Sequence, residues 1–232
     1  MKYTSTRDAS VAVSAAQAVV DGITADGGLY VPESIPKLDW RSLTDMAYAE
    51  RADAVLRAYF DFDVTGVAQA AYATFETDDP APTVKLDDNL FVLELFHGRT
   101  HAFKDMALSV LPRLVVAAKK ALGVTEKTLI LVATSGDTGK AALEGFKDVD
   151  GTQVCVFYPT DGVSAVQKLA MQTQDGGNVT VVGIDGNFDD AQTAVKAAFA
   201  DAELNAALKA KGVALSSANS INIGRLVPQI AY

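Results

Sequence analysis

Lys104 is the residue best placed for covalent chemistry, within the segment E-L-F-H-G-R-T-H-A-F-K-D at residues 94–105. It follows a predicted strand and a glycine turn, and it begins a predicted helix. The positive end of a helix and partial desolvation both favour the neutral amine, which is the form that attacks a carbonyl carbon to give an imine. This placement alone is weak support, because most lysines near helix starts are solvated surface residues.

His97 and His101 lie four residues apart in the same segment, a spacing that occurs in metal sites. We expect no metal here, because a third ligand is missing and the segment lacks the glutamate of an HExxH helix. Packing or hydrogen bonding is the expected role of both imidazoles.

A second segment with chemical potential is the turn Thr134-Ser135-Gly136-Asp137-Thr138, between a predicted strand and a predicted helix. Small and hydroxylic residues leave backbone N–H groups free to bind an anion at the helix N-terminus. The glycine and lysine that follow are similar to the tail of a P-loop. That motif requires glycine at position 134 and serine or threonine at position 141, where this chain has threonine and alanine. An ordinary capped turn is an equally good interpretation.

The third segment, S-S-A-N-S-I-N-I-G-R at residues 216–225, gathers amides and hydroxyls around one arginine, Arg225. A guanidinium group is suited to bidentate contacts with phosphate or carboxylate. The alternative is a loop and helix cap rich in asparagine and serine, which is common.

The elements that would position these segments are clearest between residues 89 and 212. Continuous apolar runs such as residues 129–132 are typical of strands covered on both faces. Their alternation with helical stretches predicts an α/β domain with a parallel sheet and flanking helices. The predicted strands are 90–96, 128–133, 153–158 and 179–184. The predicted helices are 103–122, 138–147, 164–174, 188–199 and 202–211, and Pro112 should kink or split the first of them.

Two further regions flank this domain. Residues 1–88 are predicted to be mainly helical, with helices at 12–20 and 45–60 and a short extended piece after the turn D-G-G-L-Y-V-P at 26–32. Residues 213–232 would begin a larger C-terminal domain. Because the sequence stops within the apolar stretch L-V-P-Q-I-A-Y, we expect it to be cut from a longer protein.

Composition limits the classes of partner. The 232 residues carry a formal net charge of −9, which argues against a nucleic-acid partner because such binding needs a basic face. The single cysteine, Cys155, allows no intrachain disulfide and fits a reducing compartment. We see no signal peptide and no apolar run that could span a bilayer. These features predict a cytoplasmic protein with neither a membrane nor a nucleic-acid partner.

Taken together and in order, the motifs of this chain resemble those of the threonine synthase family. The motifs are S-T-R at 5–7, D-G-G-L-Y-V-P at 26–32, the lysine segment at 94–105, T-S-G-D-T-G at 134–139, and the stretch from 216 to 232. The related serine dehydratases and cysteine synthases share the fold without the D-G-G-L-Y and S-S-A-N-S-I-N-I-G-R motifs. The resemblance covers nearly the whole chain.

This resemblance implies a fold-type II enzyme that uses pyridoxal 5'-phosphate (PLP), with residues 89–212 as its small domain. Threonine synthases are lyases that convert O-phospho-L-homoserine and water to L-threonine and phosphate. Lys104 would hold PLP as an aldimine and then move protons between substrate carbons, while PLP acts as the electron sink. Asp137 would lie near the PLP ring oxygen, at a position where relatives often have asparagine.

The resemblance also implies a set of substrate-binding residues with amide, hydroxyl or cationic groups. They are Ser135, Gly136 and Thr138 for the substrate carboxylate, and Lys168, Asn219, Asn222 and Arg225 for the substrate phosphate.

Two departures from the family qualify these expectations. Many members have proline and a bulky apolar residue where Arg99 and His101 stand, so the roles of these two residues stay open. Threonine synthases also continue well beyond residue 232, and the missing part includes the glycine-rich loop that grips the PLP phosphate. We therefore expect this sequence alone to bind PLP poorly and to be inactive.

Two other functions stay open. One is a different PLP-dependent lyase or dehydratase of the same fold. The other is a non-catalytic, threonine-synthase-like protein that binds a phosphorylated ligand. The sequence does not define an oligomeric state.

Overall fold

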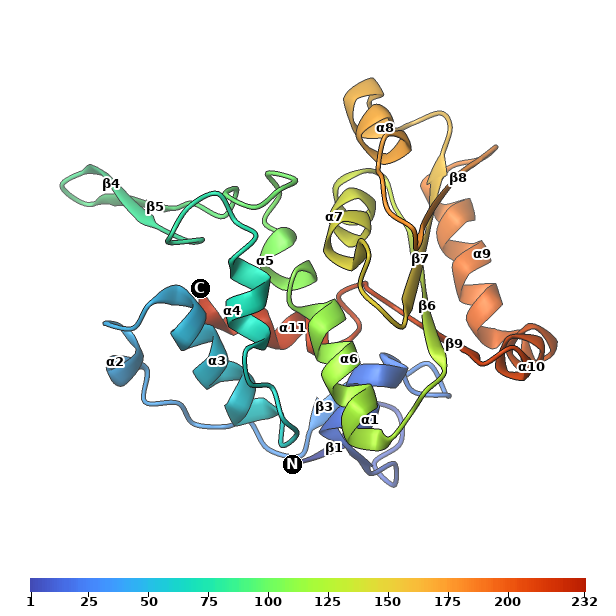
Figure 1. The fold of residues 1–232 in the computed structure, drawn as a ribbon, viewed down its shortest axis with the longest axis horizontal. Coiled ribbons are helices and arrows are strands. Elements are labelled where there is room, and N and C mark those ends of the chain that lie inside the picture. The colour runs from blue at the N-terminus through green and yellow to red at the C-terminus, as the bar shows by residue number, and fades with distance from the viewer.

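Four strands form a parallel sheet in the order β8-β7-β6-β9 in the computed structural model, which describes residues 1–232 (Figure 1). The predicted α/β fold is confirmed, and the predicted strands at 128–133, 153–158 and 179–184 are each present. The fourth strand lies at 213–216, where the sequence suggested a new domain, and it pairs in parallel with β6. The domain boundaries themselves stay a prediction. The strands are β6 (Lys127–Ala133), β7 (Thr152–Pro159), β8 (Val179–Ile184) and β9 (Val213–Ser216).

Helices cover both faces of this sheet, with α7 on one side and α9 on the other (Figure 1). The pleat of β6 explains this arrangement, because successive side chains point to opposite faces. Ile130 and Val132 join the main core on the side of α7, whereas Leu131 and Ala133 pack in a smaller cluster with residues of α9. The helices of this part are α7 (Asp137–Phe146), α8 (Ala165–Gln172), α9 (Phe188–Ala200) and α10 (Ala202–Ala210).

The N-terminal region holds a three-stranded antiparallel sheet in addition to the predicted helices. The sequence prediction missed this sheet because its strands are only two to four residues long, too short to show alternation. The region packs against segments near the C-terminus, so both ends of the chain contribute to one core. Its elements are β1 (Lys2–Ser5), β2 (Val13–Ser14), α1 (Ala15–Asp21), β3 (Tyr30–Pro32), α2 (Trp40–Leu43), α3 (Tyr48–Tyr59) and α4 (Val67–Tyr72), and the C-terminal segments are α11 (Ile223–Leu226) and the 3-10 turn η1 (Val227–Ala231).

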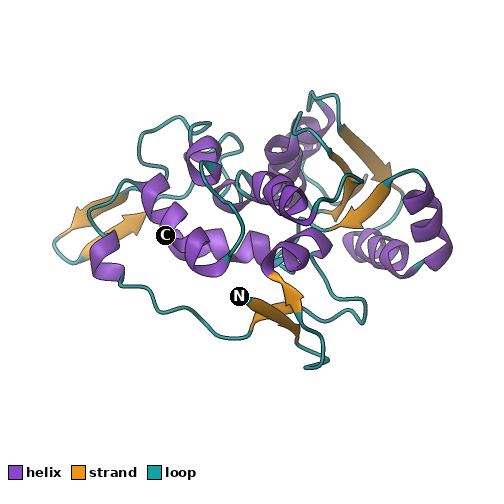
Figure 2. Ribbon diagram, turned by 60° about the horizontal axis from the view of Figure 1, so that its bottom comes forward, coloured by secondary structure: helices purple, strands orange, loops and turns teal.

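The strand predicted at 90–96 does not belong to the parallel sheet, and this expectation was wrong. Residues Leu90–Leu93 form β5, which pairs antiparallel with β4 (Thr83–Asp87) in an isolated hairpin. Figure 2 shows this hairpin at one end of the molecule and the parallel sheet at the other. Because β9 fills the edge position beside β6, the sheet has no place there for the hairpin.

The helix predicted at 103–122 is split, as the proline indicated. A short helix α5 (Asp105–Leu108) is followed by α6 (Leu111–Leu122), and Pro112 lies in the first turn of α6, where a missing N–H costs nothing. The split places Lys104 directly before α5, at its N-cap position. The longest helix is α9 with 13 residues, and no helix is long and apolar enough to cross a membrane.

Candidate active site

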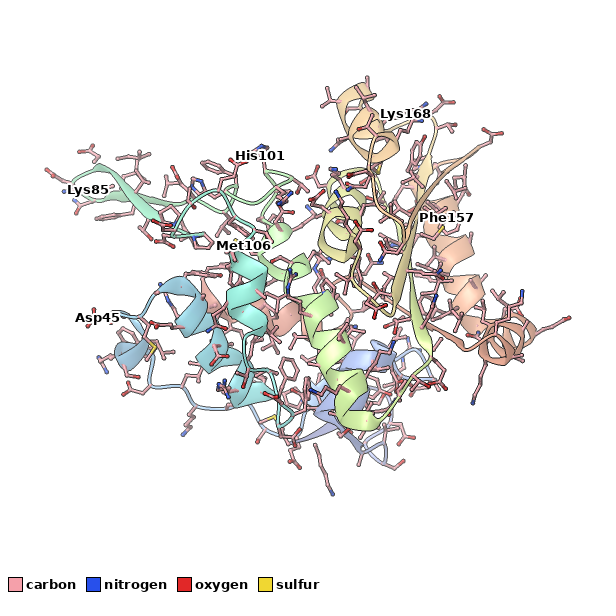
Figure 3. All side chains as sticks on the ribbon, viewed as in Figure 1. Asp45, Lys85, His101, Met106, Phe157 and Lys168 are labelled. Carbon is pink, nitrogen blue, oxygen red and sulfur yellow. The ribbon has the colours of Figure 1, made fainter.

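Lys104 is partly buried and faces the turn that follows β6. Its side chain is 19% exposed, with Nζ 3.6 Å from Oδ2 of Asp137 and 4.6 Å from the ring centre of Phe103. Along the chain it lies between His101 and Met106, which are labelled in Figure 3. The sequence predicted that the helix end would favour the neutral amine. The structure adds the carboxylate of Asp137 close to that amine.

The turn after β6 has the amide-lined form that its small residues indicated. The buried hydroxyl of Thr134 accepts hydrogen bonds from the N–H groups of Gly136 (3.0 Å) and Gly139 (2.9 Å). The backbone N–H groups of Ser135 and Thr138 have no partner within the chain. They stand at the start of α7, where the helix dipole also attracts negative charge. The turn can therefore bind an anion such as a carboxylate.

A cavity of about 1170 Å³ opens beside this turn, at the carboxyl ends of the strands. Ser135 and Thr138 line one side of it, and Ser217, Asn219 and Arg225 from the loop after β9 line another. The rest of the wall comes from α9 and from the N-terminal loop. Ligands of open α/β sheets bind in this position.

Arg225 brings an unpaired cationic group to this cavity. It is 2% exposed, and its side chain donates one hydrogen bond, from Nη1 to the carbonyl of Ala218 (2.7 Å). Its buried Nε has no hydrogen-bond partner, and no carboxylate forms an ion pair with it. Burial lowers the pKa of Arg225, because desolvation disfavours the charged form. A buried cation without a counter-ion is well suited to bind an anionic ligand.

The predicted site residues Lys104, Gly136, Asp137, Lys168 and Asn222 are not among the residues that line this cavity, and their assigned roles stay predictions. Asn222 is fully buried, and its Nδ2 donates to the carbonyls of Val19 (3.1 Å) and Ser217 (3.2 Å) while its Oδ1 accepts from the N–H of Gly224 (2.8 Å). Its whole amide is used to shape the loop. Lys168 lies on α8, near the top of Figure 3, and does not line the cavity.

A neighbour of Lys168, Gln167, is the residue that sequence reasoning missed. Its Nε2 donates a 2.7 Å hydrogen bond to Oδ1 of Asp137, the carboxylate that faces Lys104. A phosphate ligand is expected to be a cation, so the sequence pointed to Lys168, and the uncharged Gln167 beside it gave no comparable signal.

The two N-terminal motifs meet at another wall of the cavity. Arg7 donates from Nη1 to the carbonyl of Asp26 (2.6 Å), and the N–H of Gly28 donates to Oδ1 of the same aspartate (3.0 Å). A side chain at position 28 would collide with the hydroxyl of Ser5. The close contact with the S-T-R motif at residues 5–7 therefore explains the glycine in the D-G-G-L-Y-V-P motif. Arg7, Asp26 and Gly27 all line the cavity.

Comparison with known proteins places this arrangement among named relatives. A family profile described as "Threonine synthase N terminus" matches residues 2–72. Threonine synthase of Pseudomonas aeruginosa is 40% identical over all of this chain and half of its own length. Human "Threonine synthase-like 1" is 40% identical over 93% of this chain and 31% of its own length. The crystal structure of PLP-bound threonine synthase from Brucella melitensis superposes with a TM-score of 0.88 at 40% identity, covering all of this chain and half of that one. The chain thus spans half or less of the length of these relatives.

Proposed function

Because the chain belongs to the threonine synthase family, we propose that it supplies the lysine-bearing half of a site that converts O-phospho-L-homoserine and water to L-threonine and phosphate. The observation that carries this proposal is the shared cavity of the amide-lined turn and the unpaired guanidinium of Arg225. The amide-lined turn is suited to bind the substrate carboxylate, and the guanidinium is suited to bind the substrate phosphate.

The residues present also suit the cofactor of the family. PLP needs a primary amine and polar neighbours, and Lys104 offers a partly buried amine that lies beyond hydrogen-bond distance from its carboxylate neighbour at 3.6 Å. Lys104 and Asp137 would hold PLP, with Asp137 near its ring oxygen. When bound, PLP supplies an electron sink that stabilises negative charge on substrate carbons.

The substrate would be fixed at its two anionic ends. The free N–H groups of Ser135 and Thr138, with Gly136 between them, bind and orient the carboxylate at the start of α7. The guanidinium of Arg225 and the amide of Asn219 bind the phosphate, the leaving group of the reaction. Such a two-point hold places the substrate carbons between the two anchors.

Lys104 is the group that would move protons between those carbons. An amine can donate a proton in its charged form and accept one in its neutral form, and the carboxylate of Asp137 lies 3.6 Å from this amine. Burial of four-fifths of the side chain limits the access of water to the amine.

The same proposal includes the binding partners and the cellular location of the protein. The substrate is a small molecule, and the net charge of −9 supports the absence of a nucleic-acid partner. One free, half-buried cysteine, whose thiol pKa is raised by burial, supports a cytoplasmic location.

The test is formation of L-threonine and phosphate from O-phospho-L-homoserine by the natural-length gene product with PLP. Equal amounts of both products, lost in Lys104→Ala but kept in the control Lys140→Ala, would support the proposal. Arg225→Gln should lower kcat/KM by about 100-fold, the value of a hydrogen bond to a charged group. Turnover of serine or threonine without phosphate release would instead indicate another lyase of this fold. Binding of O-phospho-L-homoserine without turnover would indicate a ligand-binding protein.

A further inference from the structure

Gln167 joins α8 to the neighbourhood of Lys104 through a continuous set of contacts. Its Nε2 donates to Oδ1 of Asp137 at 2.7 Å, and Oδ2 of the same carboxylate lies 3.6 Å from Nζ of Lys104. The two oxygens of Asp137 therefore face two different side chains. Nothing in the proposed function uses the glutamine.

The orientation of the Gln167 amide is fixed from the other side. The hydroxyl of Ser164, the N-cap of α8, donates to Oε1 of Gln167 at 3.0 Å, while the N–H of Gln167 donates to the same hydroxyl oxygen at 3.3 Å. An amide whose oxygen is engaged in this way must present its NH₂ group to Asp137. The hydrogen bond to the carboxylate is thus specified by the cap.

The turn itself is shaped to admit this side chain. A Cβ atom at Gly136 would lie 2.5 Å from the amide of Gln167, and the φ angle of Gly136 is +149°. The φ angle favours glycine at this position, and a Cβ atom there would force the Gln167 amide to move. The glycine of the anion-binding turn therefore also provides the space for Gln167.

Asp137 needs such a partner because it is not held by burial. Its side chain is 50% exposed, and in solution an exposed carboxylate is free to rotate into water. We propose that Gln167 is a positioning residue that holds Asp137 toward Lys104 and thereby sets the chemical reactivity of the Lys104 amine. This inference deepens the proposed function and rests on it for its biological meaning, but the contact network exists without it.

The test measures the chemical reactivity of Lys104 in the chain without cofactor or substrate. Trace acetylation with acetic anhydride, read for each lysine by mass spectrometry across pH 6–10, reports the neutral amine alone. Lys147, which pairs with Asp175 at a distance from this network, serves as the internal reference. Gln167→Met removes the donor with little change of length, and Gln172→Met is the matched control because Gln172 lies on the same helix and donates to Tyr158 (2.8 Å).

We expect Asp137→Asn to raise the acetylation of Lys104 near pH 8 by about five- to tenfold, as loss of one nearby charge in a partly exposed site implies. Gln167→Met should raise it about two- to threefold, because the carboxylate then spends part of its time in solvent. In an Asp137→Asn background, Gln167→Met should cause no further change, since the carboxylate that Gln167 positions is then absent. Gln172→Met should leave it unchanged.

The double variant separates positioning from mere packing, because a loosened α8 would change Lys104 whether or not residue 137 carries a carboxylate. The proposal is overturned if Gln167→Met and Gln172→Met give equal rates, if Gln167→Met still raises the rate in the Asp137→Asn background, or if Asp137→Asn has no effect. Circular dichroism confirms folding, and should Gln167→Met not fold, Gln167→Ala takes its place in both backgrounds. Failure of the threonine assay would leave these rates unaffected, so the two proposals fail independently.

Discussion

Replacing Asn222 by alanine should destabilise the fold far more than replacing Asn219, which lies three positions earlier in the same loop. The amide of Asn222 satisfies the carbonyls of Val19 and Ser217 and the N–H of Gly224, all in a buried setting. A buried polar group left without a partner costs about 1 kcal/mol at the low end, so three such groups predict a loss of about 3 kcal/mol. The side chain of Asn219 makes no hydrogen bond within the chain, and its removal should cost less than about 0.5 kcal/mol.

Urea unfolding followed by circular dichroism at 222 nm measures both losses. With an m-value of about 3 kcal/mol per M for a chain of this size, the midpoint for Asn222→Ala should fall by about 1 M. The midpoint for Asn219→Ala should stay within about 0.2 M of the parent value. Equal midpoints for the two variants would refute the division into a structural and a cavity-lining asparagine. So would a loss of more than about 0.3 M in Asn219→Ala alone.

Three further predictions concern other buried contacts. Gly145→Ala should lower the free energy of unfolding, measured with heat or urea, by about 2 kcal/mol or more, because the new Cβ would collide with the carbonyl of Leu108 and push α7 away from α5. Gly66→Ala should lower it by only about 1 kcal/mol, because Gly66 has open space around it and only its positive φ is unfavourable for alanine. Asp21→Asn should raise the free energy of unfolding at pH 7 by on the order of 0.5 kcal/mol and leave it unchanged near pH 3. Burial raises the pKa of Asp21 despite its hydrogen bonds to Gln17 and Tyr30. The protonated carboxyl therefore contributes fully to stability below the ordinary pKa of aspartate, and this contribution is lost as the pH rises through the pKa of Asp21 in the folded protein. Thr134→Val should lower the free energy of unfolding by about 2 kcal/mol, because the N–H groups of Gly136 and Gly139 would lose their acceptor. The same change should weaken the binding of inorganic phosphate or acetate, measured by calorimetry. Thr134→Ser keeps the hydroxyl and should retain both the stability and the anion binding.

The sequence located the elements of the parallel sheet well, for a physical reason. Central strands such as β6 and β7 are buried and rich in apolar residues, and the intervening helices carry their own periodicity, so β6, β7 and the more exposed β8 were each predicted within two residues of their observed ends. Strand β5 of the hairpin, Leu-Phe-Val-Leu, has the same apolar composition, with Phe91 56% exposed, and composition cannot tell an exposed apolar strand from a buried one. Its misplacement followed from that ambiguity.

The parts of the candidate site that depend on local backbone conformation could be predicted from the sequence. The parts that depend on how distant segments pack together could not. The turn at Ser135–Thr138 follows from small residues between a strand and a helix. By contrast, whether Asn219 or Asn222 faces the cavity depends on the carbonyl of Val19, which no local pattern reveals. Gln167 and Lys168 are adjacent on α8, where successive side chains point about 100° apart, so Gln167 reaches Asp137 while Lys168 points away from it, and no local pattern separates the two.

The contact between Asn222 and Val19 joins residues that are 203 positions apart. During synthesis at about 5–20 residues per second, α1 must wait roughly 10–40 s before the segment that completes its surroundings has been made. In that interval the apolar residues Ala15, Ala18 and Val19, which are fully buried in the finished fold, have at most part of their final cover, because α6 is made before α11. The nascent chain therefore has its most vulnerable apolar surface at its oldest end, and it should depend on chaperones there rather than at the segments that emerge last.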